Sequence, residues 1–396
     1  MCVRCDIPLF QASDISSSGN CKNTSPLPPK AKLQSPYILP SEALAKLINS
    51  TPSMEGDLES WRKRRATPGI TSCIQDGDIW KTVPGPNGGC FFENGPERAN
   101  SSELRIALSL GFDGFAFARS SYAGRHSTGV LSFSVANLEN DLRYRPQNLM
   151  LCGLVPGPHE FNADQLQQWN KAWVTDLLNL YENGMTVKTP QFPEGRLVRV
   201  VLIAVSCDHP AMCRMCGFGD HSNKAAFCHR CLVSHPELFT EPGITLDAFP
   251  ARTGVRHKQQ SAEYAQCNTD QERHAYVKAN AARYFELSRL PYFDPVRMTL
   301  IDPMHNILLG IIKTVWYDGW ILGKAFRSET GTGRKRELDT IHEYLDTFEM
   351  PAWVARLPTE VGAPAGGSLT SDEWKGLALV YCPIIVRSYF TQQMVC

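Results

Sequence analysis

Three groups of residues have types and spacings that could support chemistry. The first is a pair of acids. Asp113 follows a run of alternating apolar residues, and Asp208 follows the most hydrophobic run in the chain. If both runs are strands, their terminal carboxylates can converge and, with a third acid, hold two Mg²⁺ (or Mn²⁺) ions for phosphoryl transfer. The alternative, which residue type alone favours, makes Asp113 a turn residue and Asp208 a helix cap.

The second group is a cluster of cysteines and histidines. Two C-x-x-C pairs, Cys213 with Cys216 and Cys228 with Cys231, are separated by eleven residues. Four thiolates at this spacing can form a tetrahedral structural Zn²⁺ site. The alternative is a run of free cysteines in a reducing compartment, which rarely gives two ordered pairs. The ligand set stays open, because four histidines are interspersed: His209, His221, His229 and His235.

The third group is Asp302 and His305, three residues apart at the head of an apolar segment. Such a histidine could face a metal, with the aspartate as its partner. The alternative is an aspartate that caps a helix and has a histidine nearby. Competing catalytic templates are absent, including Gly-x-Ser-x-Gly, a P-loop lysine and His-Glu-x-x-His.

Apolar periodicity predicts the elements that position these groups. Strands are expected at 104–110, 128–135, 148–154 and 197–205, and an amphipathic helix at 165–180. Helices are also expected at 41–66, with Ser41 as cap, and at 261–287, 304–322, 334–346 and about 370–389. The expected divisions are a flexible leader (1–40), a helical or irregular region (41–100), a first part of the core (101–210), a Cys/His-rich insertion (211–300) and a helical region with the start of the rest of the core (301–396).

Composition sets further limits. Lys+Arg and Asp+Glu both number 40, so the net charge is zero, which argues against a polycationic tail but leaves a basic face open. The sequence has no run of 18 apolar residues, and its N-terminal apolar run is too short for a signal peptide. We therefore expect no membrane association, and we expect the cysteines to be thiols or metal ligands rather than disulfides.

Five stretches together resemble a known family. The similarity runs from about residue 60 to the end, and the family is the transposase of CACTA (En/Spm-type, tnp2-like) DNA transposons of basidiomycete fungi. The stretches are Leu108–Phe115 (LSLGFDGF), Leu154–Glu160 (LVPGPHE), Cys207–Ala211 (CDHPA) leading to Gly217–Ser222 and Phe227–Cys231, Ile301–Asn306 (IDPMHN) and Met350–Pro358.

The resemblance implies a DDE/D transposase with an α/β fold, namely an RNase H-like mixed-sheet core carrying a zinc-containing, mostly helical insertion. The first two acids of the family fall on Asp113 and Asp208. The zinc ligands would be Cys228, Cys231 and His305, with Asp302 as fourth partner. Cys213 and Cys216 are either extra thiols or completion of a local four-thiolate site, and His221 remains a further candidate.

The third acid should follow the D-x-x-H motif, where Asp372 and Glu373 are the candidates and Glu329 and Glu337 are less attractive. The resemblance further implies a nuclear protein that cuts transposon ends and joins them to target DNA, with homo-oligomerisation left open. Family members are usually longer, so a truncated copy is expected. The alternative is a catalytically dead, zinc-stabilised module that binds DNA or protein. Candidate phosphate contacts are Arg119, Arg125, Arg214, Lys224, Arg252, Arg256, His257 and Lys258.

Overall fold

The computed structural model describes residues 35–65, 67–92, 103–115, 127–155, 157, 160–326, 336–351, 354, 356–363 and 367–385. The chain divides into two compact units, Met1–Leu300 and Ile301–Cys396. Most of the expected leader, 1–34, lies outside the described residues. Among the helices that the structure describes, none has the length and apolar character needed to cross a bilayer.

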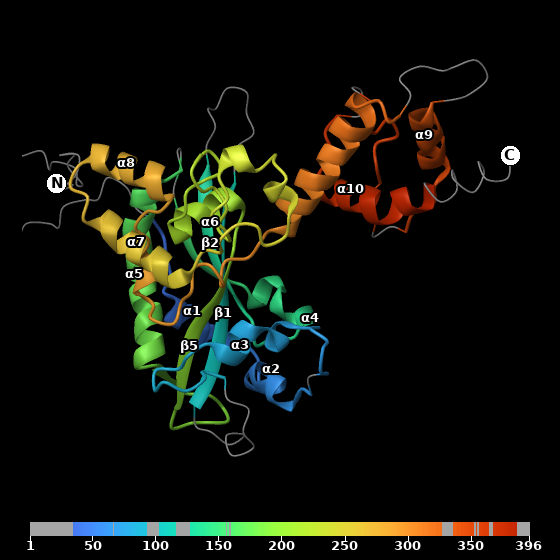
Figure 1. Cartoon of the computed structure of the whole chain (residues 1–396). Coiled ribbons are helices and arrows are strands. Elements are labelled where there is room, and N and C mark those ends of the chain that lie inside the picture. Colours follow the sequence, from blue (N-terminus) through green and yellow to red (C-terminus); the bar gives the residue numbers. More distant parts are fainter. Residues whose placement is uncertain are drawn as a thin grey trace, which may run out of the picture. The chain divides into compact units, whose positions relative to one another are not determined.

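A five-stranded mixed sheet forms the centre of the first unit (Figure 1). Its order is β3-β2-β1-β5-β4, in which only the β1–β5 pair is parallel. The expected α/β class with a mixed sheet is confirmed. The strands are β1 (Glu103–Phe115), β2 (Thr128–Val135), β3 (Met150–Val155), β4 (Met185–Val187) and β5 (Arg196–Ser206).

β1 is longer than the apolar alternation predicts. The alternation stops at Leu110, whereas the strand continues to Phe115 because β2 supplies backbone partners along this stretch, pairing Asp113 with Val130 and Phe115 with Thr128. Two glycines, Gly111 and Gly114, therefore lie inside the strand rather than ending it. The short strand β4 was not expected.

Helix α5 (Ala163–Glu182) covers one face of the sheet. Asn162 and Gln165 form a capping box that starts the helix, two residues before the expected first residue. Trp173 packs edge-on against Phe133 of β2, with ring centroids 5.7 Å apart. The buried side chains of β1 and β2 on this face thus form a continuous core with the helix.

The N-terminal region is two short helices rather than the single helix expected over 41–66. They are α1 (Pro40–Ile48) and α2 (Met54–Glu59), separated by Asn49–Ser53, which contains Pro52. Proline disfavours the helical conformation of the residue before it. Ser41 does not cap α1, because its backbone N–H and hydroxyl both donate to Asp176 of α5.

Short elements cover the other face of the sheet. Buried Asn137 ties them to it, since its side chain bonds Leu58 O, Arg105 O and Ala107 N. Trp61, Trp80 and Phe92 pack together beside them. The elements here and at the end of β2 are η1 (Ser60–Lys63), η2 (Ile74–Asp76), α3 (Asp78–Thr82), α4 (Asn140–Arg143) and η4 (Pro146–Asn148).

The segment after β5 leaves the sheet at Cys207 and returns to the same strand. Val205 N–H donates to Met298 O, and Leu300 N–H donates to Val205 O, so the two ends of the segment meet beside one residue. Its helical elements are α6 (His209–Cys216), η5 (His235–Glu237), η6 (Pro242–Ile244), α7 (Gly254–Ala265), α8 (Asp270–Asn280) and η7 (Glu286–Arg289).

The helix expected at 261–287 is instead the end of α7 and the whole of α8. Thr269 and Glu272 form a capping box that starts α8 anew, and Ala281 ends it in the left-handed region at φ 48°. A capping threonine and its glutamate therefore override the weak periodicity of this polar stretch.

The described part of the second unit is helical. Wide π-helical turns make up η8 (Met304–Ile312) and η9 (Val315–Leu322), and α10 (Ser371–Gly376) continues into η11 (Leu377–Tyr381). Thr370 and Glu373 form a capping box at the start of α10. The remaining helix is α9 (Glu337–Thr347). Trp316, Trp374 and Leu377 are fully buried in the core of this unit.

Candidate active site

The two predicted acids lie at the ends of neighbouring parallel strands. The last paired residues of β1 and β5 are Gly111 and Ser206. Asp113 is two residues beyond the first, and Asp208 is two residues beyond the second. Both acids therefore lie at the same edge of the sheet, Asp113 on β1 and Asp208 where the chain leaves β5.

The charges of both acids affect the pKa of the Cys207 thiol. Burial raises the pKa of this thiol to about 12, and the charges of Asp208 and Asp113 raise it further. Both carboxylates therefore act on one sulfur atom. The same environment keeps Cys207 protonated at neutral pH, which excludes it as a thiolate nucleophile.

Each acid also has a local structural contact. Asp113 is exposed, and its Oδ1 accepts a hydrogen bond of 2.8 Å from Gly114 N–H. Asp208 caps α6, with Oδ1 accepting a hydrogen bond of 2.7 Å from Ala211 N–H. The helix-cap interpretation of Asp208 is thus confirmed, and the turn interpretation of Asp113 is wrong because the residue lies within β1. Capping occupies one carboxylate oxygen of Asp208 and is compatible with a second role for the other.

Cys213 and Cys216 do not join the other C-x-x-C pair. Both lie on α6 with side chains buried in the core, where burial raises the pKa of the Cys213 thiol to about 12 and that of Cys216 well above its usual value. Cys213 donates to Gly219 O at 3.3 Å. Throughout the described part of the chain, no three His, Cys, Asp or Glu side chains gather as a metal site. The local four-thiolate arrangement is therefore not formed, and exposed His221 does not complete a cluster.

Cys228 and Cys231 have surroundings suited to a metal. Cys228 Sγ accepts a hydrogen bond of 3.3 Å from Arg230 N–H, and Cys231 accepts one from Val233 N–H. Each sulfur thus has a backbone N–H donor two residues later in the chain, an arrangement that can orient a metal-binding cysteine. Burial and the charge of Cys228 nevertheless raise the pKa of Cys231 without a metal. All ten cysteines that the structure describes are free thiols.

Asp302 and His305 form a tight pair within the second unit. His305 Nδ1 lies 2.5 Å from Asp302 Oδ2, and Asp302 Oδ1 accepts from Met304 N–H at 2.8 Å. Partial burial works against ionisation, but these hydrogen bonds lower the pKa of Asp302 overall. The aspartate orients the imidazole in the way that carboxylates orient metal-binding histidines. Nε2 is then the ring nitrogen that could bind a metal.

The candidate third acids, Asp372 and Glu373, lie in the first turn of α10. The Glu373 carboxylate is committed to the capping box, accepting from Thr370 N–H at 2.6 Å and from its hydroxyl at 2.8 Å. Asp372 is exposed, and no partner of its side chain is found among the described residues. Glu329 lies outside the described residues.

Most of the expected phosphate contacts are engaged within the protein. Arg214 pairs with Glu160 at 2.6 Å, and Arg256 pairs with Glu263 at 2.9 Å. Arg252 is buried and bonds backbone carbonyls, while Lys258 donates to Leu290 O. His257 is buried and stacked on Phe218. Lys224 is exposed, and Arg119 and Arg125 lie outside the described residues.

The sequence reasoning missed two residues near the acids. Glu160 lies beside the end of β1, because a Cβ at Gly114 would come within 3.2 Å of its Oε1. In the sequence, Glu160 is marked only as the last residue of the LVPGPHE stretch. Arg297 is exposed on the turn that leads back to β5, with no ion pair or side-chain hydrogen bond within the described part of the chain. A lone arginine outside any motif gives no sequence signal.

The match to known families covers this site. Residues 75–240 match the transposase family tnp2. The matched segment contains the whole sheet, Asp113, Asp208 and the Cys228–Cys231 pair, and it ends before Asp302. No curated protein matches the chain. The match supports a transposase family.

Proposed function

We propose that this chain carries the catalytic core of a DDE/D-type DNA transposase of the CACTA (En/Spm, tnp2-like) class of fungi, acting in the nucleus. The observation that carries the proposal is the placement of Asp113 and Asp208 at the ends of parallel neighbours in the sheet. The tnp2 match over the same residues supports it.

An RNase H-like core is part of this proposal. It is supported by the order of the elements, in which an antiparallel β1–β2–β3 meander is followed by α5 and then by β5, parallel to β1. A right-handed crossover through a helix is the usual route between such parallel strands. This topology brings two acids that are far apart in sequence to one edge.

Oxygen donors such as these suit Mg²⁺ or Mn²⁺. Asp113 is accessible, and Asp208 keeps Oδ2 outside its capping bond, so both can contribute a ligand atom. When bound, the ions would supply an activated water or DNA 3′-hydroxyl and would neutralise the leaving oxygen. The two carboxylates would hold these cations at the scissile phosphate of a transposon end, for hydrolysis and then for strand transfer into target DNA. Asp372 or Glu373 would contribute the third acid.

A structural Zn²⁺ site is also proposed. Cys228 and Cys231 are the ligands for which the surroundings fit best, because a backbone N–H donates to each sulfur and both side chains are partly exposed. His305, oriented by Asp302, fits as an imidazole donor. Cys213 and Cys216 do not fit, since their thiols point from α6 into the hydrophobic core of the first unit.

The test is metal-dependent nicking of duplex DNA by the full chain. Wild-type protein should nick DNA in Mg²⁺ or Mn²⁺, and Asp113→Asn should abolish this nicking. The matched control is Asp141→Asn, which removes an exposed carboxylate that belongs only to a weak surface pair with Arg145. Folded, zinc-loaded wild-type protein that never nicks DNA would contradict the proposal, as would full activity of Asp113→Asn.

A second candidate is a catalytically dead module that binds DNA or protein. It is favoured by the commitment of the Glu373 carboxylate to its capping box. Glu373→Gln separates the candidates because glutamine preserves a capping box but offers no carboxylate. Loss of nicking in Glu373→Gln or Asp372→Asn, with folding retained, would identify the third acid. Absence of nicking in wild type would favour the module.

A further inference from the structure

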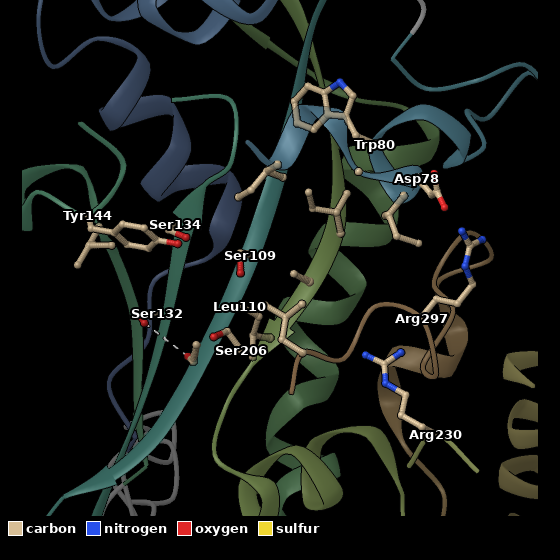
Figure 2. Close-up of a pocket in the computed structure, with 18 residues that line it drawn as sticks. Asp78, Trp80, Ser109, Leu110, Ser132, Ser134, Tyr144, Ser206, Arg230 and Arg297 are labelled. Atoms are coloured by element: carbon tan, nitrogen blue, oxygen red, sulfur yellow. Dashed lines mark hydrogen bonds between the residues drawn. The ribbon is translucent and has the colours of Figure 1, made fainter. Parts of the chain in front are cut away.

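A groove with a mixed polar and apolar lining lies on the face of the sheet opposite α5. Its cavity is about 600 Å³, and it is bounded by β1, β2 and β5, by α3, and by the turn that precedes Leu300. Figure 2 shows Arg230 and Arg297 on one side of the β1–β5 pair and Tyr144 on the other. All of these residues belong to the first unit.

The floor of the groove is small and hydroxylated. Ser109 and Gly111 of β1, Ser132 and Ser134 of β2 and Ser206 of β5 line it. A Cβ at Gly111 would come within 3.1 Å of Ser132 Oγ, so glycine there keeps the floor open to a ligand backbone. The groove therefore offers serine hydroxyls and close approach along β1, beside apolar side chains such as Ile79 and Ile203.

Arg297 is presented to the groove by a braced turn. Asp294 Oδ1 accepts from Val296 N–H at 2.9 Å and from Arg297 N–H at 3.0 Å. The Arg230 guanidinium donates to the carbonyls of Val296 and Thr299, so its role is to hold this turn. A rigid turn that carries a guanidinium with no protein partner in the described chain costs little to order on binding an anion.

The floor leads directly to the acids. Gly111 and Ser206 line the groove. Asp113 follows Gly111 by two residues on the same face of β1, and Asp208 follows Ser206 by two residues as the cap of α6. A ligand lying along β1 and β5 therefore ends at the candidate active site. Asp78 also lines the groove, where its one negative charge is outnumbered by the guanidinium groups of Arg230 and Arg297.

We propose that this groove binds the phosphodiester backbone of the DNA strand that enters the active site, with Arg297 contacting a phosphate. The proposal rests on the proposed function, and it names where the substrate lies. The serine hydroxyls suit phosphate and sugar oxygens, and exposed Tyr144 offers a ring to a sugar or base. Arg297 is a binding and positioning residue that does not take part in the chemical step.

The test measures binding separately from cleavage. Fluorescence anisotropy would follow the full chain with a fluorescein-labelled duplex bearing a single-stranded 3′ end, without divalent cations so that no cleavage occurs. Arg297→Glu should weaken binding about tenfold near 0.1 M salt and lower the slope of log Kd against log salt by about 0.9. Arg297→Lys should restore most of both. The matched control is Lys171→Glu, an exposed cation on α5, which should change little.

Several outcomes overturn the inference. Equal binding by Arg297→Glu and wild type overturns it while leaving the proposed function standing. Equal weakening by Arg297→Glu and Lys171→Glu reduces the effect to net charge and also overturns it. Wild type that binds no DNA overturns the proposed function and the groove together. A photoreactive p-benzoylphenylalanine replacing Tyr144 should crosslink to the labelled strand, and crosslinking to the protein's own chain instead would show that a protein segment occupies the groove.

Discussion

Asp208 offers the sharpest test, because its two proposed roles respond differently to two substitutions. As the cap of α6 it accepts a hydrogen bond of 2.7 Å from Ala211 N–H. Asparagine caps about as well as aspartate, whereas alanine costs about 1 kcal/mol. Asp208→Asn should therefore leave the free energy of unfolding within a few tenths of a kcal/mol, and Asp208→Ala should lower the Tm by about 2 °C.

Catalysis should follow the other role. Both variants lack the carboxylate, so both should lose metal-dependent nicking by about 10³-fold or more, equal to about 4 kcal/mol of activation barrier. Loss of a cap alone cannot produce this. Thr253→Ala is the matched control, since it removes the cap of α7, which accepts from Arg256 N–H at 3.3 Å, without touching the acids.

The assay pairs thermal unfolding with initial nicking rates on the same preparations. The reasoning would be refuted if Asp208→Asn nicked DNA at a rate within tenfold of wild type, because Asp208 would then be only a cap. It would also be refuted if Thr253→Ala lost as much activity as Asp208→Asn, because the loss would then follow from reduced stability.

Three further predictions concern the ion pair of Arg196, the buried imidazole of His257 and the Cys228 thiol. Arg196→Met should destabilise the first unit by about 3–5 kcal/mol in urea unfolding, because it leaves buried Glu55, now 2.7 Å from the guanidinium, without its cation. Arg62→Met, at a more exposed pair with Glu59, should cost less. Burial lowers the pKa of His257 to about 4, so the neutral form is the stabilising one; the unfolding free energy should fall by about 3 kcal/mol as the pH drops from about 6.5 to 4, and His257→Phe should flatten this part of the pH profile. Cys228→Ser should lose bound zinc by mass-spectrometric metal analysis, whereas Cys213→Ser should retain it, and the reverse result would move the zinc site to α6.

The parts of the fold that the sequence predicted are those with strong periodicity. The apolar run at 197–205 and the amphipathic pattern at 165–180 became β5 and α5 within a few residues. The end of β1 was not predictable, because its last residues are glycine-rich and owe their strand conformation to pairing with β2. The break between α1 and α2 lies at Pro52, and apolar periodicity alone does not reveal it.

The candidate site was predictable in part, for related reasons. Asp113 and Asp208 stand out because each follows an apolar run, and neighbouring strands bring such residues together. Pairs such as Arg214 with Glu160 depend on tertiary contacts between residues far apart in sequence, so basic residue type alone misidentified Arg214 as free for phosphate. Arg297 shows the converse, since nothing in its sequence surroundings distinguishes it from any surface arginine.

The return of the chain to Val205 has a consequence for how this protein can change over evolutionary time. Residues 207–298 form a closed excursion whose two ends are fixed beside one strand. Closing a loop costs only slightly more as the loop lengthens, so residues can be gained or lost in the mostly exposed stretch 235–250 of the excursion at small thermodynamic cost. Such changes would leave the β1–β5 register, and with it the spacing of the two acids, untouched. The catalytic geometry and the size of the excursion are thus free to evolve separately.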